Sequence, residues 1–183
     1  LFTAPDLGRY ISGAILFEET LYQNHADGES MVEKLNKQGI IPGIKVDKGL
    51  KPLVGALHHE TYCSGLDGLT ERAQEYYKQG ARFAKWRAVL QITEDGPSDF
   101  AIKENAWGLA RYARAVQEAG LVPIVEPEIL MDGDHHIDKT AAIQERVIKE
   151  VYAACAIAGV LLEGTLLKPS MTVCGAECPD QVD

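Results

Sequence analysis

The strongest constraint on the fold is a regular alternation between short aliphatic segments and amphipathic stretches along the chain. Five segments are rich in β-branched or aliphatic residues and are bounded by Gly or Pro, as strands usually are. We predict strands at Tyr10–Phe17, Ile40–Val46, Ala81–Leu90, Leu121–Glu126 and Val160–Lys168. Apolar residues recur at helical spacing in the four stretches between them. Strict alternation of this kind predicts parallel strands joined by helical crossovers.

Each of the four predicted helices has a recognisable end. They cover Glu29–Lys37, Leu66–Gln79, Ser98–Glu118 and a segment from about Asp138 to Gly159. The third is the clearest, because Ser98 is a suitable N-cap and Gly120 lies just beyond its C-terminus. Two α/β architectures fit this order of elements: a (β/α)8 barrel and an open doubly wound sheet.

Glycine patterns favour the barrel. A doubly wound sheet usually carries a phosphate-binding loop after a strand, and neither G-x-G-x-x-G nor G-x-x-x-x-G-K-[ST] follows a predicted strand here. A closed (β/α)8 barrel takes about 250 residues. We therefore expect residues 1–183 to form a single, incomplete barrel domain of about five consecutive strands and four helices, without the first strand and the last strands.

Composition excludes several classes of partner. The net charge of −9 and the pI near 5.0 argue against nucleic acid and against an anionic membrane surface, since both attract an excess of Lys and Arg. The longest apolar stretch, around 11–17, is far shorter than the ~20 residues that span a bilayer. Cys174 and Cys178 have the spacing of half a zinc site, but no second pair follows with ligand spacing, so we expect no metal there.

Ionisable residues stand near the C-terminal ends of four of the five predicted strands. Parallel barrel strands are covered on both faces and should be almost wholly apolar, so these charges need a reason. They are Lys45, Asp47, Lys85, Arg87, Glu126, Glu128 and Lys168. Strand residues i and i+2 point to the same face, and catalytic groups gather at the C-terminal mouth of such barrels. Any one pair is also consistent with a solvated strand end, but four strands together predict a mixed pocket for a phosphorylated substrate and proton transfer.

The lysines indicate the type of chemistry. A free lysine has a pKa of about 10.4 and is a poor nucleophile at neutral pH, but desolvation and neighbouring cations favour its neutral form. Lys168 follows two leucines, and Lys85 and Arg87 can supply the nearby positive charge. We therefore expect a neutral amine at Lys168 that attacks a ketone to form an imine, with Glu126 moving protons.

Five longer motifs narrow this hypothesis. They are SGAILFEET at 12–20, GIKVDKG at 43–49, QGARFAKWR at 79–87, LVPIVEPEIL at 121–130 and LLEGTLLKP at 161–169. In this order they resemble class I fructose-1,6-bisphosphate aldolases, from Leu1 to about Cys178. The resemblance implies a (β/α)8 barrel, usually a homotetramer, that reversibly cleaves fructose 1,6-bisphosphate to dihydroxyacetone phosphate and glyceraldehyde 3-phosphate without a metal or other cofactor.

The resemblance also implies roles for the charged residues. Lys168 would form the imine, Glu126 would be the acid/base that dehydrates the carbinolamine, and Glu128 would be a supporting carboxylate. Lys85 would act near the bond that breaks. The expected substrate-binding residues are Lys45, Asp47, Lys85 and Arg87.

Some features of the family fall outside these residues. Its first-strand aspartate, its later phosphate-binding loops and its C-terminal tyrosine tail are not present in the 183 residues. Residues 169–175, PSMTVCG, also differ from the PSMVTPG or PNMVTPG expected. The KPSM and GAEC sequences favour plastid-type members, which predicts the chloroplast stroma or else the cytoplasm.

Three rival hypotheses remain. A metal-dependent aldolase is suggested by His58-His59 and Asp134-His135-His136, but adjacent loop histidines do not easily bind one ion, and we expect them to be surface polar residues. Another Schiff-base aldolase would share a strand-borne lysine but not the Lys-Trp-Arg and Glu-Pro-Glu pairings. A non-catalytic scaffold on an aldolase barrel is disfavoured because every expected catalytic position within the chain is intact.

Overall fold

One curved parallel sheet forms the framework of the molecule. The computed structural model describes residues 1–57 and 59–181. In spatial order the strands of this sheet are β1 (Gly13–Leu16), β2 (Ile41–Lys45), β5 (Phe83–Leu90), β6 (Val122–Ile129) and β7 (Leu166–Leu167). All four pairings between neighbours are parallel, which confirms the prediction from the sequence.

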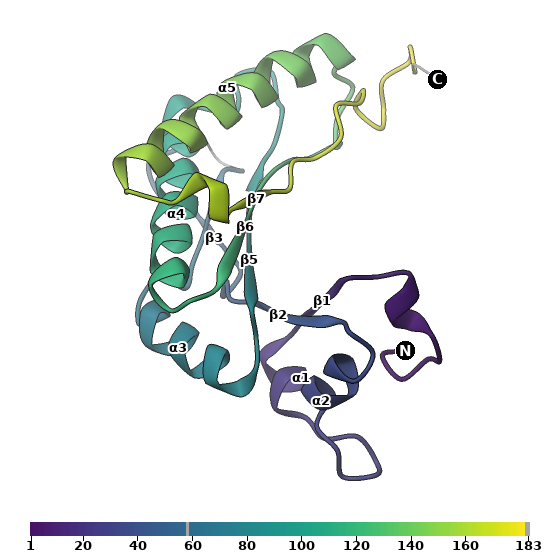
Figure 1. The fold of residues 1–183 in the computed structure, drawn as a ribbon. Helices are drawn as coiled ribbons and strands as arrows, with labels where there is room; N and C mark the ends of the chain where they lie inside the picture. Colours follow the sequence, from purple (N-terminus) through teal and green to yellow (C-terminus); the bar gives the residue numbers. More distant parts are fainter. Residues whose placement is uncertain (58, 182–183) are drawn as a thin grey trace.

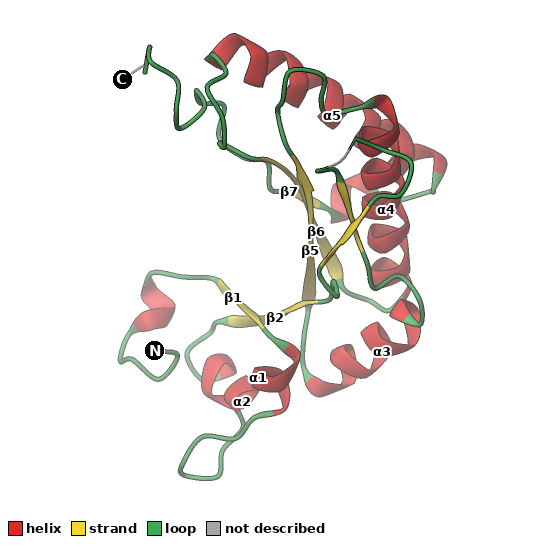
Figure 2. Cartoon of the chain, turned by 180° about the vertical axis from the view of Figure 1, so that it is seen from behind, coloured by secondary structure: helices red, strands yellow, loops and turns green. Residues whose placement is uncertain are grey.

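The helices lie on the convex side of this sheet. They are α1 (Glu18–Tyr22), α2 (Met31–Asn36), α3 (Leu69–Gln79), α4 (Asp99–Glu118) and α5 (Ile137–Ile157). Figures 1 and 2 show α3, α4 and α5 outside β5, β6 and β7, with α1 and α2 next to β1 and β2. The sheet and its outer helices therefore have the arrangement of an arc of a (β/α)8 barrel.

The predicted N-cap of α4 is confirmed, and α2 has a cap of its own. The Ser98 side chain accepts a hydrogen bond from the backbone N–H of Ala101 at 3.1 Å and caps α4. Ser30 and Glu33 form a capping box at the start of α2, which fixes where this short helix begins. The four predicted helices are all present, and their starts lie within three residues of those predicted.

The strand predicted at Val160–Lys168 is wrong in its first half. Leu162–Gly164 forms a 3-10 turn, and only Leu166–Leu167 pairs with β6. The physical reason is the Gln117 side chain of α4, which accepts from the backbone N–H of Leu161 at 3.0 Å and donates to its carbonyl oxygen at 2.8 Å. Because both backbone groups of Leu161 are occupied, an aliphatic sequence is not enough to make this segment a strand.

Several short elements were not predicted. These are α1, a 3-10 turn at Leu7–Arg9, and an antiparallel hairpin of β3 (Leu50–Pro52) and β4 (Thr61–Cys63). The hairpin ends beside α4, where Asn105 donates to the carbonyl oxygen of Thr61 at 2.9 Å. None of these elements is long enough to show the periodicity on which the sequence analysis relied.

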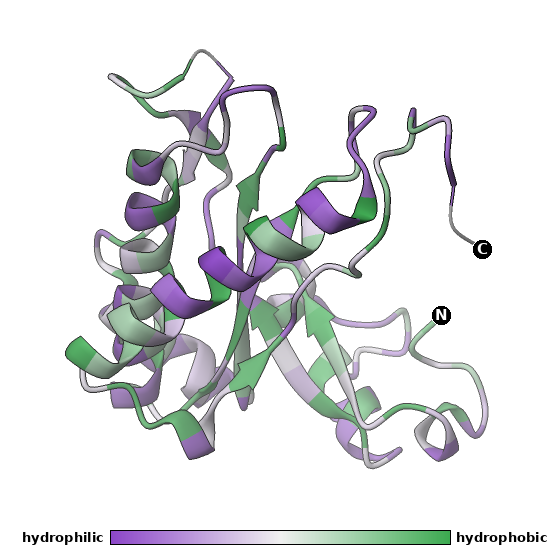
Figure 3. Cartoon of the chain, turned by 90° about the horizontal axis from the view of Figure 1, so that it is seen from above, coloured by the Kyte–Doolittle hydropathy of each residue, from purple (hydrophilic) through white to green (hydrophobic). Residues whose placement is uncertain are grey.

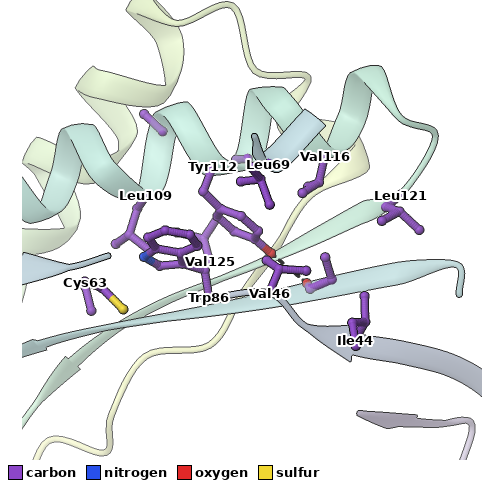
Figure 4. Packing of buried hydrophobic residues seen from close by; sticks show 14 of the residues in the cluster. Ile44, Val46, Cys63, Leu69, Trp86, Leu109, Tyr112, Val116, Leu121 and Val125 are labelled. Carbon is purple, nitrogen blue, oxygen red and sulfur yellow. Dashed lines mark hydrogen bonds between the residues drawn. The ribbon is translucent and has the colours of Figure 1, made fainter. Parts of the chain in front are cut away.

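Alternating burial divides β5 between its two faces. Ala84, Trp86 and Ala88 are buried on the helix side, whereas Phe83, Lys85 and Arg87 are less buried and lie on the other side. Trp86 stacks on Tyr112 of α4 with ring centroids 5.4 Å apart (Figure 4). Figure 3 shows that the strands are largely hydrophobic, whereas the helices carry both hydrophobic and hydrophilic residues. The core thus lies between the sheet and the helices, and the charged residues are left to the concave side.

The Tyr112 hydroxyl ties the core to the sheet and gives a test of this packing. It donates to the carbonyl oxygen of Ala84 at 2.7 Å and lies 3.1 Å from that of Ile124, and complete burial raises its pKa well above the usual value. Tyr112→Phe should lower the free energy of unfolding by about 1–3 kcal/mol, because a buried carbonyl loses its partner. Urea denaturation of the full-length polypeptide measures this. Tyr152→Phe, whose side chain is 41% exposed, should change it by less than about 0.5 kcal/mol.

The loop histidines differ in their exposure, and two of the cysteines lie near one carbonyl group. His58 lies outside the described residues, and His59, Asp134 and His136 are exposed as expected. His135 is buried, so its prediction as a surface residue is wrong: the backbone of the 131–135 loop pairs with residues 175–177, which cover it. Burial lowers the pKa of His135. The thiols of Cys174 and Cys178 each lie near the carbonyl oxygen of Asp180, at 3.6 and 3.7 Å.

Residues 1–57 and 59–181 lack two kinds of feature. No three His, Cys, Asp or Glu side chains in this part of the chain are grouped as metal ligands would be. None of its helices combines the length and the apolar character that crossing a membrane requires.

Candidate active site

Strand register brings the predicted charges together at the C-terminal end of the sheet. Lys45 is paired with Lys85 across β2 and β5, and Arg87 with Glu126 across β5 and β6. The pairing of β6 with β7 ends at Val125 and Leu167, and the backbone N–H of Lys168 donates to the Val125 carbonyl oxygen at 2.9 Å. Four neighbouring strands therefore contribute to one site.

Glu126 lies between two lysines at the centre of this site. Its Oε1 atom is 2.6 Å from Lys168 Nζ, and its Oε2 atom is 2.8 Å from Lys85 Nζ. The first contact is a hydrogen bond, whereas the second is close enough for an ion pair but is not aligned as a hydrogen bond. Glu126 is only 5% exposed. One buried carboxylate can thus exchange a proton with Lys168 while Lys85 balances its charge.

Arg87 and Glu128 form a second pair next to this centre. The guanidinium donates to the Glu128 carboxylate, and this hydrogen bond raises the pKa of Arg87 against the opposing effect of partial burial. Both side chains are partly exposed, at 40% and 29%. Arg87 therefore stays charged and reaches solvent, as the binding of an anionic ligand requires.

Lys45 and Asp47 form a third pair after β2. Lys45 Nζ lies 2.5 Å from Asp47 Oδ1, which also accepts a hydrogen bond from the backbone N–H of Gly49 at 3.2 Å. The Asp47 side chain is 3% exposed, against 29% for Lys45. In this geometry Asp47 holds Lys45 at the strand end, and its own contact with substrate stays a prediction.

The expected desolvation of Lys168 is not seen. Its side chain is 56% exposed, because β7 is the edge strand of the described sheet and no further strand packs beside it. The charged group in contact with it is the Glu126 carboxylate rather than a cation. Lys85, with a side chain 13% exposed, is the more buried of the two amines that contact Glu126.

Sequence reasoning missed the polar residues that hold the segment after Lys168. Gln144 on α5 is 7% exposed and contacts Ser170, whose hydroxyl in turn accepts from the backbone N–H of Ile129 at 3.0 Å. One signal was available. Gln144 precedes Val147 and Val151 by three and seven positions, so a polar side chain stands in the apolar stripe of the helix.

Known proteins resemble this chain over nearly all of its length. The sequence profile described as "Fructose-bisphosphate aldolase class-I" matches residues 1–183. A chloroplastic fructose-bisphosphate aldolase from Oryza sativa subsp. japonica is 60% identical over 99% of the chain and 46% of its own length. Chloroplastic fructose-bisphosphate aldolase 2 of Pisum sativum is also 60% identical over 99% of the chain, which covers 51% of that protein.

A solved structure shows the same fold. It is fructose-bisphosphate aldolase from Plasmodium falciparum in complex with TRAP and a small-molecule inhibitor. It superimposes with a TM-score of 0.98 at 54% identity, over 100% of this chain and 53% of that one. The chain spans about half the length of the relatives it matches. Because the profile covers every residue, the chain belongs to the class I fructose-bisphosphate aldolase family.

Proposed function

We propose that the protein containing this chain is a Schiff-base lyase that reversibly cleaves fructose 1,6-bisphosphate to dihydroxyacetone phosphate and glyceraldehyde 3-phosphate. The observation that supports this most is the contact of one buried carboxylate, Glu126, with both Lys168 and Lys85. Imine chemistry needs an amine and an acid/base within hydrogen-bonding reach of each other. The proposal needs no metal, since the imine itself accepts the electrons of the broken bond.

In the proposed reaction, the neutral amine of Lys168 first attacks the C2 carbonyl of the ketose. Glu126, having taken the proton from Lys168, gives a proton to the hydroxyl of the carbinolamine, which leaves as water, and a protonated imine remains. The Glu126 carboxylate then accepts the C4 hydroxyl proton. As the C3–C4 bond breaks, its electron pair moves into the imine to give an enamine, and glyceraldehyde 3-phosphate departs.

Two further steps release the second product. Glu126 returns the proton that it took from the C4 hydroxyl to C3 of the enamine, and water then hydrolyses the imine to release dihydroxyacetone phosphate and free Lys168. Lys85 stabilises the charge that develops beside Glu126 in these steps, because it lies 2.8 Å from that carboxylate. Glu128 supports the site by holding Arg87.

The substrate-binding role is proposed for cations at the strand ends. Lys45, Lys85 and Arg87 lie on neighbouring strands β2 and β5, and Asp47 and Glu128 orient two of them. Counted with Lys168, these side chains are four cations against three carboxylates, Asp47, Glu126 and Glu128, which leaves one net positive charge at the strand ends of a chain whose net charge is −9. A sugar bisphosphate would therefore be attracted to the mouth of the sheet rather than to the surface in general.

We propose that further strands of the same polypeptide complete the barrel around this single domain, residues 1–183. Supporting this, apolar side chains of the concave face are unusually exposed: Ile15 41%, Ile41 48%, Val122 39% and Leu166 56%. Exposed apolar patches of this kind are rare on finished soluble domains. Added strands would cover these side chains and also bury Lys168.

Location and assembly follow the relatives. The rice and pea proteins are named chloroplastic, so we place this protein in the chloroplast stroma, with the cytoplasm as the alternative. We propose a homotetramer, as is usual in the family. A small sugar phosphate is the proposed partner, and neither nucleic acid nor a membrane is expected.

Borohydride trapping tests the function directly. The purified full-length polypeptide should cleave fructose 1,6-bisphosphate in the presence of a chelator, and borohydride should inactivate it only when substrate is present. Mass spectrometry should then find the reduced adduct on the peptide that contains Lys168. Loss of activity on chelation would indicate a metal-dependent enzyme, and trapping by keto-acids but not by the bisphosphate would indicate another Schiff-base aldolase. If the protein neither cleaved fructose 1,6-bisphosphate nor was trapped by borohydride in the presence of any substrate, it would be a non-catalytic scaffold.

A further inference from the structure

A buried side-chain amide contacts the segment that follows Lys168. Gln144 Nε2 donates to the carbonyl oxygen of Ser170 at 2.5 Å, and Gln144 Oε1 accepts a hydrogen bond from the Thr172 hydroxyl. The side chain reaches these groups from α5, whose covered face also includes Val147 and Val151. Both ends of one amide are therefore used to hold two residues of the same short segment.

This segment, residues 168–173, has few other attachments near the lysine. The ladder between β6 and β7 is only two residue pairs long, and the Lys168 N–H bond to Val125 is its last backbone link. Farther along, the backbone N–H of Ile129 donates to the Ser170 hydroxyl rather than to a backbone carbonyl. The path of the chain just after Lys168 is thus set by side-chain hydrogen bonds at Ser170 and Thr172.

The position of the backbone is especially important for Lys168. A lysine side chain has four rotatable bonds, so the position of its backbone sets which groups its amine can reach. Among residues 1–57 and 59–181, the one charged contact of Lys168 is the Glu126 carboxylate, 2.6 Å away. A small displacement of the backbone would therefore be passed directly to the distance between the amine and the carboxylate.

We propose that Gln144 is a positioning residue for imine formation. It fixes the backbone at Ser170, two residues after Lys168, so that the amine stays within reach of both Glu126 and the ketone carbon. This inference rests on the proposed aldolase function. It predicts that Gln144 acts on the covalent steps and not on substrate binding, because its contacts are with the segment and none is with the cations of β2 and β5.

The test compares two buried, nearly isosteric substitutions on the same helix. Gln144→Met removes the bonds to Ser170 and Thr172. Thr140→Val removes the bond of a hydroxyl that is also buried and donates to the carbonyl oxygen of Val173 at 2.8 Å. Both changes detach α5 from the 168–173 segment, one close to the lysine and the other five residues away from it. Gln144→Asn serves as a milder variant in case the Met variant folds poorly.

In the full-length polypeptide, Gln144→Met should lower kcat and the single-turnover rate of borohydride trapping by about ten- to a hundredfold, the size of effect expected when a reacting group is misplaced by about 1 Å. KM should stay within about threefold, because phosphate binding is untouched. Thr140→Val should keep kcat within about twofold. Melting temperatures should fall by similar amounts in both, and Gln144→Asn should be intermediate in kcat.

The possible outcomes are distinguishable. Equal losses of kcat in the two variants, or a rise in KM with kcat unchanged, would overturn the positioning role and leave Gln144 a structural residue only. Trapping in Gln144→Met as fast as in the parent would do the same. If the unsubstituted protein is not trapped at Lys168 at all, the aldolase function fails first, and that result is independent of Gln144.

Discussion

Lys168→Met is expected to abolish substrate-dependent trapping by borohydride and to lower kcat by roughly 10⁴–10⁶-fold, the range seen when a covalent nucleophile is removed. Methionine keeps the length of the side chain but has no amine to form the imine. Because the change keeps the length of the side chain and the backbone bond from residue 168 to Val125, the fold should be unaffected. Fructose 1,6-bisphosphate cleavage, intact mass after borohydride and thermal unfolding measure these three effects.

The matched control for this variant is Lys103→Met. Lys103 is an exposed residue on α4, so its removal should leave both cleavage and trapping unchanged. Lys85 is the informative rival, because its amine also contacts Glu126 and is the more buried of the two. If the adduct appeared on the peptide that contains Lys85 and not on the one that contains Lys168, the imine would form on β5 rather than at the end of β7. That result would refute our proposal.

Glu126→Gln is expected to lower kcat by about 10²–10⁴-fold, the usual contribution of a general acid/base. The amide has nearly the same shape but can neither give a proton to the carbinolamine nor take one from the C4 hydroxyl. Trapping at Lys168 should become slow, while KM changes little. A rapid-quench measurement of trapping, set against steady-state cleavage, separates the dehydration step from the later ones.

Loss of charge is the main confounding effect of this variant. Without the carboxylate, the ammonium groups of Lys85 and Lys168 lose the ion pairs they now make. Glu128→Gln is therefore a useful comparison, because it also removes a carboxylate that pairs with a cation, Arg87, but not the one that contacts Lys168. Its loss should be at least tenfold smaller. Equal losses in the two variants would mean that charge balance, not proton transfer, explains the importance of Glu126.

Much of the fold could be predicted because its signals are local. Each helix and strand was predicted from neighbouring residues: the alternation of aliphatic and amphipathic segments, the Ser98 cap and the glycines after the helices. The order of these elements then predicted the parallel sheet. Tertiary contacts decided the rest. Gln117 prevents Leu161 from joining a strand, and the pairing of 175–177 with the 131–135 loop buries His135. No sequence pattern near Leu161 or His135 predicts such a contact.

The sequence indicated which charged side chains would gather at the strand ends, but not how they would be arranged. The i, i+2 pairs at the strand ends indicated that Lys85, Glu126 and Lys168 would lie together, since parallel strands end at the same edge. That one carboxylate contacts both lysines depends on the register between β5, β6 and β7, which a single sequence does not encode locally. The exposure of Lys168 also depends on what packs beside β7, and this is a property of the whole sheet.

The division of β5 and β6 into two faces limits the changes of length that the gene can accept. Adding or removing one residue within β6, before Glu126, would turn that carboxylate toward Trp86 and Tyr112 and would bring an apolar residue to the mouth, because strand side chains alternate with a period of two. In the loops before and after these strands, side chains do not alternate between two faces, so a change of length there does not reverse which residues face the core. Natural variation in length should therefore be confined to those loops. Even a one-residue insertion inside a strand would turn its charged side chains into the core and its apolar side chains toward the mouth of the sheet.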